Sequence, residues 1–383
     1  MRKIACVITS RASYARIKTA LQAINNHSDL ELQLIAAASV LLEKYGSAVN
    51  VIERDGLNVL ERVYMIVEGE NPVTMAKSVG LGIIEITTAL DNLKPDLVIT
   101  IADRFETIAT AIASSYLNIP LVHVQGGEIT GSIDERVRHS ITKLSDYHFV
   151  SSKIALERVI KMGEDIERVF VTGCPSIDLA LKIMEDPEIR FDPFQRYGGV
   201  GTILDIHKPY MLLLQHPVTT EYAMAKEQMW RTLMAVYNTG IQCMAFWPNL
   251  DAGSDGTSKA IRTFREEFRD NTMHFFKNMP PEDFLRVLLN SACIVGNSSV
   301  AIRECSFMGV PAVIIGSRQL GRERGRNVID VDYDTGQITD AINRQVSNGK
   351  YPGENIYGEG RAGEKIADLL ATVPLTQKTR LAY

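Results

Sequence analysis

Two apolar segments that each end in polar side chains, with a helical segment between them, constrain the fold of this 383-residue chain most strongly. They cover residues 96–101 and 119–124 and have the length and composition of buried strands. Parallel strands joined by a helix present their carboxyl ends at one edge of a sheet, and ligands bind at that edge. The residues predicted to lie there are Asp103, Arg104, Gln125, Glu128 and Asp134. Several carboxylates beside an arginine suit acid/base chemistry on an anionic, sugar-like molecule.

The alternation of strand and helix extends beyond this stretch in both directions. Residues 3–9 and 32–37 are predicted to be buried strands, and a helix is predicted from Leu41. Residues 72–93 have helical periodicity, with a proline in the first turn. Such alternation is typical of a parallel, doubly wound sheet.

The pattern is interrupted at 186–209 by Asp-Pro and Gly-Gly pairs, and then it starts again. The strands predicted after the interruption cover 210–215, 241–247, 272–276, 292–295 and 311–315. We therefore predict an α/β protein with two Rossmann-like domains and a cleft between two carboxyl edges. The expected division is a first domain at 1–185, a linker at 186–209, a second domain at 210–360, and a C-terminal helix and tail at 361–383.

Composition excludes several classes of protein. The net charge of −5 and the pI of about 5.9 argue against a nucleic-acid partner, which would call for a basic excess. The chain contains no run of 18 apolar residues, so we expect no membrane partner, and its first residues are predicted to form a strand instead of a signal peptide. Five scattered cysteines without a C-x-x-C pair favour reduced thiols in the cytoplasm, and the histidine spacing predicts no metal.

The first strand ends in a possible anion site. Arg11 and the hydroxyl of Ser13 lie at a strand-to-helix turn, where helix N–H groups point outward. A helix cap with a solvated arginine is the alternative. Capping is also the alternative for Asp103 and Asp134, since both precede predicted helices.

The second half offers a candidate phosphate site. Ser298 and Ser299 follow a strand and a glycine, Glu304 lies one to two turns later at a distance suited to a ribose diol, and Arg318 follows the next strand. Hydroxyls at a helix start and an arginine both bind phosphate, although a capped helix with surface charges has the same residues. His216, directly after a strand, is either a phosphate donor or general acid, or only a cap.

A set of short motifs occurs in order along nearly the whole chain. They are residues 10–14 (SRASY), 103–105 (DRF), 126–128 (GGE) through Ile133-Asp134, Arg138-His139 with 141–143 (ITK), 173–176 (GCPS), Pro248-Asn249, 251–254 (DAGS), 296–299 (GNSS), Arg318-Gln319 and 321–323 (GRE). As a set, these motifs resemble those of the hydrolysing UDP-N-acetylglucosamine 2-epimerases, which open the synthesis of sialic-acid-type nonulosonates. The resemblance implies a GT-B-type architecture with the nucleotide sugar in the interdomain cleft.

The resemblance also implies a reaction and the residues that perform it. UDP is eliminated across C1–C2, and water then adds to the 2-acetamidoglucal to give free N-acetylmannosamine. The catalytic candidates are Asp103, Glu128, Asp134 and His216, and the substrate-binding candidates are Arg11, Ser13, Arg104, Gln125, Asn249, Ser298, Ser299, Glu304 and Arg318. No cofactor is expected, the partner is a UDP-sugar, and the expected assembly is a homodimer or homotetramer in the cytoplasm.

Two positions depart from the family pattern. Gln125 stands where some members have a glutamate, and glutamine cannot act as a base, so Glu128 or Asp134 would take that role. Val40 stands where some members have a histidine, which would make the sugar pocket more apolar. A UDP-diacetamido-trideoxy sugar of the legionaminic type is therefore a second candidate substrate. The sequence is also compatible with a non-hydrolysing 2-epimerase, an inactive nucleotide-sugar sensor and, less favoured, a glycosyltransferase.

Overall fold

The computed structural model describes residues 1–69, 71–101, 104–248, 251–269, 271–378 and 382, and two seven-stranded sheets lie within them. The first sheet is parallel throughout, in the order β3-β2-β1-β4-β5-β6-β7. Its strands are β1 (Arg2–Ile8), β2 (Leu30–Ala37), β3 (Val59–Val63), β4 (Leu97–Ile101), β5 (Leu121–Val124), β6 (Tyr147–Val150) and β7 (Val169–Val171). The α-helices of this half are α1 (Arg11–Asn26), α2 (Val49–Arg54), α3 (Pro72–Leu93), α4 (Thr107–Tyr116), α5 (Ile133–Leu144) and α6 (Lys153–Lys161).

The second sheet has the order β14-β13-β12-β9-β10-β11-β8 and is parallel except for β8, which pairs antiparallel with β11. Its strands are β8 (Val200–Gly201), β9 (Tyr210–Leu214), β10 (Gln242–Phe246), β11 (Met273–Phe276), β12 (Cys293–Gly296), β13 (Ala312–Ile315) and β14 (Val328–Val331). The remaining α-helices are α7 (Pro175–Glu185), α8 (Pro193–Tyr197), α9 (Ala225–Asn238), α10 (Ser254–Glu267), α11 (Pro281–Leu289), α12 (Glu304–Met308), α13 (Thr335–Asn348) and α14 (Ala362–Thr372).

The strands are apolar along their length because helices cover both faces of each sheet. Every residue of β4 is buried, and so is every residue of β12. The first sheet has one core cluster beneath α1 and α14 and another beneath α3 and α4. Continuous apolar strands of this kind belong in parallel sheets buried on both sides. The predicted α/β fold with two parallel-sheet halves is confirmed.

The strand order reverses once in each sheet, between β1 and β4 in the first and between β9 and β12 in the second. In open α/β sheets, ligands bind in the crevice at such switch points. The segments that follow these four strands contain Arg11, Arg104, His216 and Ser298. Gly296, at the end of β12, has φ +131°, and a Cβ there would lie 2.3 Å from the carbonyl oxygen of Leu214.

Two helical predictions were wrong in detail. The helix predicted from Leu41 is absent there: 3₁₀ turns cover Ala38–Leu41 and Glu43–Tyr45, and the helix begins only at Val49. Gly46 has φ +87°, which interrupts any helix at that point. The segment after Ser298 is likewise divided, into a 3₁₀ turn at Ser299–Ala301 and the short α12.

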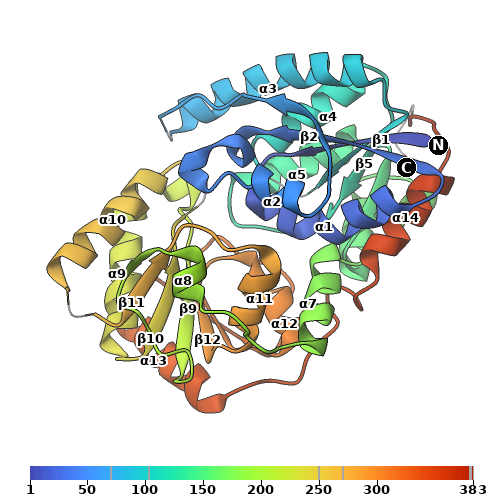
Figure 1. The fold of residues 1–383 in the computed structure, drawn as a ribbon. Helices are drawn as coiled ribbons and strands as arrows, with labels where there is room; N and C mark the ends of the chain where they lie inside the picture. Colours follow the sequence, from blue (N-terminus) through green and yellow to red (C-terminus); the bar gives the residue numbers. More distant parts are fainter. Residues whose placement is uncertain (70, 102–103, 249–250, 270, 379–381, 383) are drawn as a thin grey trace.

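Two helices pack across the predicted division. Ile177 and Ala180 of α7 belong to a core cluster of the second sheet, although α7 precedes residue 186. Ile366 and Leu370 of α14 belong to a core cluster of the first sheet. Figure 1 shows α14, in red, lying beside α1, with α7 between the two halves. The exact domain boundaries stay a prediction.

Helix α3 is the one described helix that is long and apolar enough to cross a membrane, judged by length and composition alone. It packs against α4 and β3, and 28% of its most apolar window is buried. A core helix passes the same test, so the finding is weak support for a membrane span. Figure 1 places α3 at the outer surface of the first half.

Candidate active site

A cavity of about 160 Å³ lies between the two halves, where the two switch points meet. Side chains from both sheets line it: Arg11, Tyr14, Arg16 and Arg104 come from the first half and the segments that follow its strands, and His216, Phe246, Met279, Phe284, Ser298, Ser299, Glu304 and Arg318 come from the second. The cavity predicted between the carboxyl edges of two parallel sheets is therefore present in the structure.

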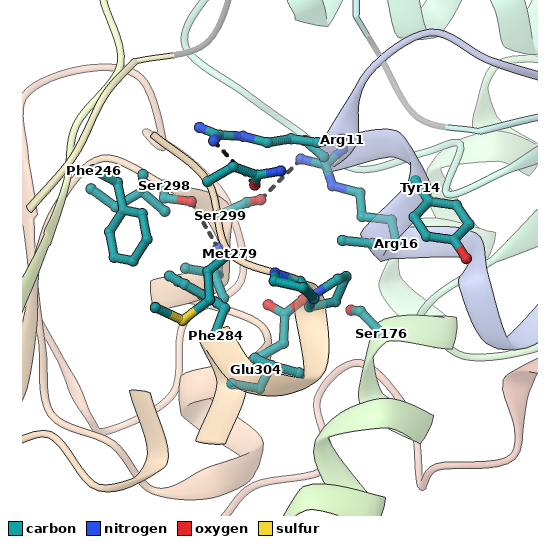
Figure 2. Close-up of a pocket in the computed structure, with 18 of the residues that line it drawn as sticks. Arg11, Tyr14, Arg16, Ser176, Phe246, Met279, Phe284, Ser298, Ser299 and Glu304 are labelled. Carbon is teal, nitrogen blue, oxygen red and sulfur yellow. Dashed lines mark hydrogen bonds between the residues drawn. The ribbon is translucent and has the colours of Figure 1, made fainter. Parts of the chain in front are cut away.

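One side of the cavity is strongly cationic. Arg16 Nη2 donates to Ser299 Oγ at 2.9 Å, which joins the first turns of α1 to the loop after β12 (Figure 2). Arg11 donates to the carbonyl oxygens of Lys277 at 2.5 Å and Trp247 at 3.1 Å. Burial, followed by the charges of Arg303 and Arg322, lowers the pKa of Arg16 to about 9. Arginines that lower one another's pKa would gain from an anionic ligand between them.

The opposite side combines apolar and hydroxyl-binding groups. Figure 2 shows Phe246, Met279 and Phe284 on one side of the cavity and Glu304 on its floor. Glu304 is 7% exposed, and within the described chain its Oε2 atom has no hydrogen-bond partner. Burial raises the pKa of Glu304. A sugar hydroxyl would satisfy this oxygen, because a buried acceptor without a partner is costly.

His216 is held in place through its backbone. Its N–H donates to Asn297 Oδ1 at 2.8 Å, and Asn297 Nδ2 donates back to its carbonyl at 2.8 Å. Burial, followed by the charges of Arg318 and Arg11, lowers the pKa of His216 well below its usual value. A neutral imidazole still donates one hydrogen bond, so His216 is suited to binding a phosphate oxygen.

Asp134, an acid/base candidate from the first half, lies close to Arg318, an anion-binding candidate from the second half. Asp134 lies in the first turn of α5, its side chain is 15% exposed, and its Oδ2 is 3.6 Å from Arg318 Nη2. Arg318 is part of the cavity lining, whereas Asp134 is not and reaches the site through this pair. Burial raises the pKa of Asp134 against the opposing charge of Arg318. A carboxyl whose pKa is moved toward neutrality, beside an anion-binding arginine, is suited to proton transfer next to a bound phosphate.

Arg104 has acidic partners in both halves. Its Nε donates to Glu106 at 2.7 Å, and its Nη2 lies 3.2 Å from Oδ1 of Asp251, in the segment after β10. Although burial lowers the pKa of Arg104, pairing with Asp251 and Glu106 raises it overall. Arg104 therefore remains charged where it lines the cavity.

Two residues predicted to bind substrate lie elsewhere. Ser13 is buried at the start of α1, and its hydroxyl and N–H both bond to Ser10 Oγ, at 2.9 and 3.1 Å. Gln125 is fully buried with φ +66°, and its Nε2 donates to Cys174 Sγ at 2.9 Å. Neither residue is part of the cavity lining. The geometry therefore assigns Ser13 to the helix cap and gives Gln125 a structural role.

Glu128 also lies away from the cavity lining. It is fully buried, and Arg303 and Arg322 of the other half bind its carboxylate. Burial alone would raise the pKa of Glu128, but these two charges, with a hydrogen bond from Ser151, lower it to about 2. So strongly paired a carboxylate is a poor base, which favours a structural role for Glu128 over proton transfer.

Val40 does not make the cavity more apolar. It is fully buried in the core cluster beneath α1, and neither cavity of the cleft includes it. The geometry therefore gives no support to a sugar pocket reshaped by Val40 and Gln125. Asp103 and Asn249, also predicted for the site, lie outside the described residues.

Arg16 and Asp251 were not predicted from the sequence. Arg16 follows Arg11 by five residues, so a second arginine in the first two turns of α1 was the available signal. Asp251 belongs to the 251–254 motif, but only the fold shows that it pairs with Arg104.

A second cavity of about 280 Å³ adjoins the first, and Arg11 lines both. Its lining is rich in cations and hydroxyls, including Ser39, Lys44, Ser254, Arg262 and Lys277. Over the described part of the chain, no group of three or more His, Cys, Asp or Glu side chains is arranged to hold a metal ion.

Comparisons with known proteins agree with this geometry. The family model described as UDP-N-acetylglucosamine 2-epimerase matches residues 22–371. The chain is 35% identical to the Legionella pneumophila protein named UDP-N,N'-diacetylbacillosamine 2-epimerase (hydrolyzing), covering 98% of this chain and 97% of that one. It is 30% identical to the Campylobacter jejuni GDP/UDP-N,N'-diacetylbacillosamine 2-epimerase (hydrolyzing), covering 86% and 84% respectively.

A solved structure supports the architecture. The Methanocaldococcus jannaschii UDP-GlcNAc 2-epimerase, in complex with UDP-GlcNAc and UDP, has a TM-score of 0.78 to this chain at 20% identity. The match covers 96% of this chain and 99% of that one, which confirms the GT-B-type fold. With the family model covering 22–371 and relatives at 30% identity or more, the chain belongs to the UDP-N-acetylglucosamine 2-epimerase family, and it resembles the hydrolysing members.

Proposed function

We propose that the protein is a hydrolysing 2-epimerase that releases UDP and a free 2-epimeric amino sugar from a UDP-linked sugar. The observation that carries the proposal is the position of Asp134, a carboxyl with a raised pKa, 3.6 Å from Arg318, which itself lines a cavity rich in arginines. A base and an anion-binding group are thus available at one point, as an elimination with a diphosphate leaving group requires.

The proposed reaction has two steps. A carboxylate takes the C2 proton, the C2–H electrons form the C1=C2 double bond, and the C1–oxygen bond breaks with its electron pair leaving on UDP. Arg11, Arg16 and Arg318 would stabilise the charge on the departing diphosphate, and His216 would donate a hydrogen bond to it. In the second step the C1=C2 electrons bind a proton at C2, on the face opposite to the one that lost it, while water oxygen bonds to C1 and gives up its proton to a carboxylate. Asp134 is proposed for one of the proton transfers and Asp103 for the other.

We propose a UDP-diacetamido-trideoxy sugar, of the UDP-N,N'-diacetylbacillosamine kind, as the substrate. The support comes from the two relatives whose names give that activity. UDP-N-acetylglucosamine is the second candidate, since the family model and a 29% identical Neisseria meningitidis relative carry that name. Comparison of kcat/KM for the two sugars tests the assignment: the diacetamido sugar is expected to be turned over faster, and the reverse order would overturn it.

We also propose a homo-oligomer that forms through α3. Val73, Leu81 and Ile84 are 62%, 42% and 62% exposed on its outer side. Two copies of α3 packed antiparallel about Leu81 would place Lys77 of each copy opposite Glu85 of the other, four residues to either side. Burial of the apolar side chains and pairing of these charges both favour a second copy of the chain as the occupant.

The five cysteines of the chain are free and buried, which favours a reducing compartment, and we propose the cytoplasm. Cell fractionation tests this location, and recovery of the protein outside the cytoplasm would contradict it.

A further inference from the structure

Glu128 joins the two halves of the protein through a fully buried carboxylate. Its Oε1 accepts a hydrogen bond from Ser151 at 2.7 Å, within its own half. Its Oε2 accepts a hydrogen bond from Arg303 and lies 3.0 Å from Nη2 of Arg322, both in the other half. A buried ion pair of this kind fixes a particular arrangement, because loss of one partner leaves charges without water or counterion.

The backbones around Glu128 are in direct contact with the loop that carries Arg318. The N–H of Gly131 donates to the carbonyl of Arg318 at 3.1 Å, and Arg322 Nε donates to the carbonyl of Ile129 at 3.2 Å. A Cβ on Gly131 would lie only 1.9 Å from the carbonyl oxygen of Ser317. These contacts fix the position of residues 128–131 relative to residues 317–322.

Two ion pairs cross between these same segments and their continuations. Glu128 pairs with Arg322, and six residues later Asp134 pairs with Arg318. The first pair is buried and tightly made, whereas the second is partly exposed and spans 3.6 Å. Both pairs therefore join residues 128–134 to residues 318–322.

Arg303 links Glu128 to residues that line the cavity. Its Nη1 donates to Ser299 Oγ at 3.2 Å, and it directly precedes Glu304 in the chain. Both Ser299 and Glu304 line the cavity. Glu128 is thus linked to two parts of the site. One link is the chain segment that continues to Asp134, and the other is Arg303, which bonds to Ser299.

We propose that Glu128 is a positioning residue that sets the distance between Asp134 and Arg318 and orients Ser299 through Arg303, without transferring a proton itself. The inference rests on the proposed function, since it assigns Asp134 to chemistry and Ser299 to nucleotide binding. The 126–128 motif would then hold the two halves in a fixed relative position, a role that the sequence of the motif alone does not indicate.

The test is Glu128→Gln, with Asp178→Asn as the matched control. Asp178 is also a buried carboxylate that joins distant elements, since it accepts hydrogen bonds from the N–H groups of Ala362 and Gly363 at 2.8 and 2.7 Å. Both variants lose one buried carboxylate charge, so both are expected to lose stability. Only Glu128→Gln is expected to lower kcat per folded molecule, by about 10- to 100-fold, because small misplacements of reacting groups cost that much.

Two further readouts separate positioning from chemistry. Glu128→Gln is expected to keep the acid limb of the kcat–pH profile and to weaken UDP binding, measured by calorimetry, whereas Asp178→Asn changes neither. Abolished turnover with the acid limb lost and UDP affinity intact would make Glu128 a proton-transfer group and overturn the proposal. Equal kcat and UDP affinity per folded molecule in the two variants would give it a merely structural role, which also overturns it.

Two complementary measurements keep the proposal testable. Should Glu128→Gln fail to fold, Ser151→Ala removes one hydrogen bond to the same carboxylate and is expected to give a smaller loss of kcat and UDP affinity in the same pattern. No change in either quantity would count against the proposal. If the wild-type protein turns over no UDP-sugar, the proposed function fails, but UDP affinity and hydrogen exchange of residues 127–134 still report whether Glu128 sets this register.

Discussion

Oδ2 of Asp134, in the first turn of α5, lies 3.6 Å from Nη2 of Arg318, which follows β13 in the other half of the molecule. Neither residue is near the other in sequence, and each belongs to a segment that follows a strand of a different sheet. Their approach connects the expected acid/base function of the first half with the anion-binding function of the second.

Asp134→Asn tests the chemical half of this relationship. Asparagine keeps the size of the side chain but cannot accept a proton, so kcat is expected to fall by about 10²- to 10⁴-fold. UDP affinity is expected to change little, because the arginines of the cavity remain. Steady-state kinetics and calorimetry on the same preparation check both parts. A variant with near wild-type kcat would leave Asp134 with only a place in the first turn of α5, which Ser132 caps.

Arg16→Ala tests the anion-binding half. Arg16 lines the cavity and is joined to Ser299, so its loss removes one charge from the proposed diphosphate site. Hydrogen bonds to charged groups are worth about 1.5–3 kcal/mol, which corresponds to roughly 10- to 100-fold in UDP affinity. Arg190→Ala, at an exposed ion pair that is not part of the cavity lining, is the control, and equal UDP affinity in both variants would remove Arg16 from the site.

Most of the fold was predictable because its strands are continuous apolar runs punctuated by Pro and Gly. Residues 96–101 were predicted as a strand from composition alone, and β4 covers Leu97–Ile101. The failures have local causes: β3 has alternating burial at a sheet edge, and its Glu61 and Arg62 hide the strand pattern. The region after Leu41 has helix-forming residues, but Gly46 in the left-handed region divides it.

The sequence indicated which residues line the cavity where they directly follow a strand, but not which of them turn into the protein core instead. His216, Ser298, Arg11 and Arg318 all line the cavity, as position after a strand indicates. Gln125 also follows a strand, yet its positive φ and its bond to Cys174 turn it away. Sequence spacing carries no information on that backbone conformation or on a partner 49 residues away.

Acid should weaken the folded state through two buried carboxylates. The two groups are Glu128 and Glu164, and burial alone would raise the pKa of each. At Glu128 the charges of Arg303 and Arg322 lower the pKa to about 2. At Glu164 hydrogen bonds from His148, Lys143 and Lys378 lower it to about 2, against an ordinary value of 4.5 for both. Since the unfolded chain binds more protons between these values, stability is expected to fall as pH drops from about 4.5 toward 2.

Glu128→Gln is expected to make that fall shallower, since one of the two groups no longer titrates. Urea unfolding midpoints between pH 7 and pH 3 measure the slope, with the exposed Glu266→Gln as the control that leaves it unchanged. Identical slopes in the wild type and in Glu128→Gln would contradict the pairing of Glu128 with Arg303 and Arg322.

The α3 surface makes a prediction about assembly. Leu81→Glu introduces a charge at the centre of the proposed antiparallel contact and is expected to yield monomers by light scattering. Ile203→Glu, at another exposed apolar side chain, is expected to leave the mass unchanged. An oligomer that survives Leu81→Glu would place the contact elsewhere.

NMR of the wild-type protein with a UDP-diacetamido-trideoxy sugar in deuterium oxide follows the proposed elimination and hydration at the reacting carbons. A hydrolysing 2-epimerase is expected to release UDP and a free sugar with inverted configuration and one deuterium at C2. An equilibrium between two UDP-linked epimers, or a free sugar without deuterium at C2, would contradict the proposed hydrolysing 2-epimerase reaction.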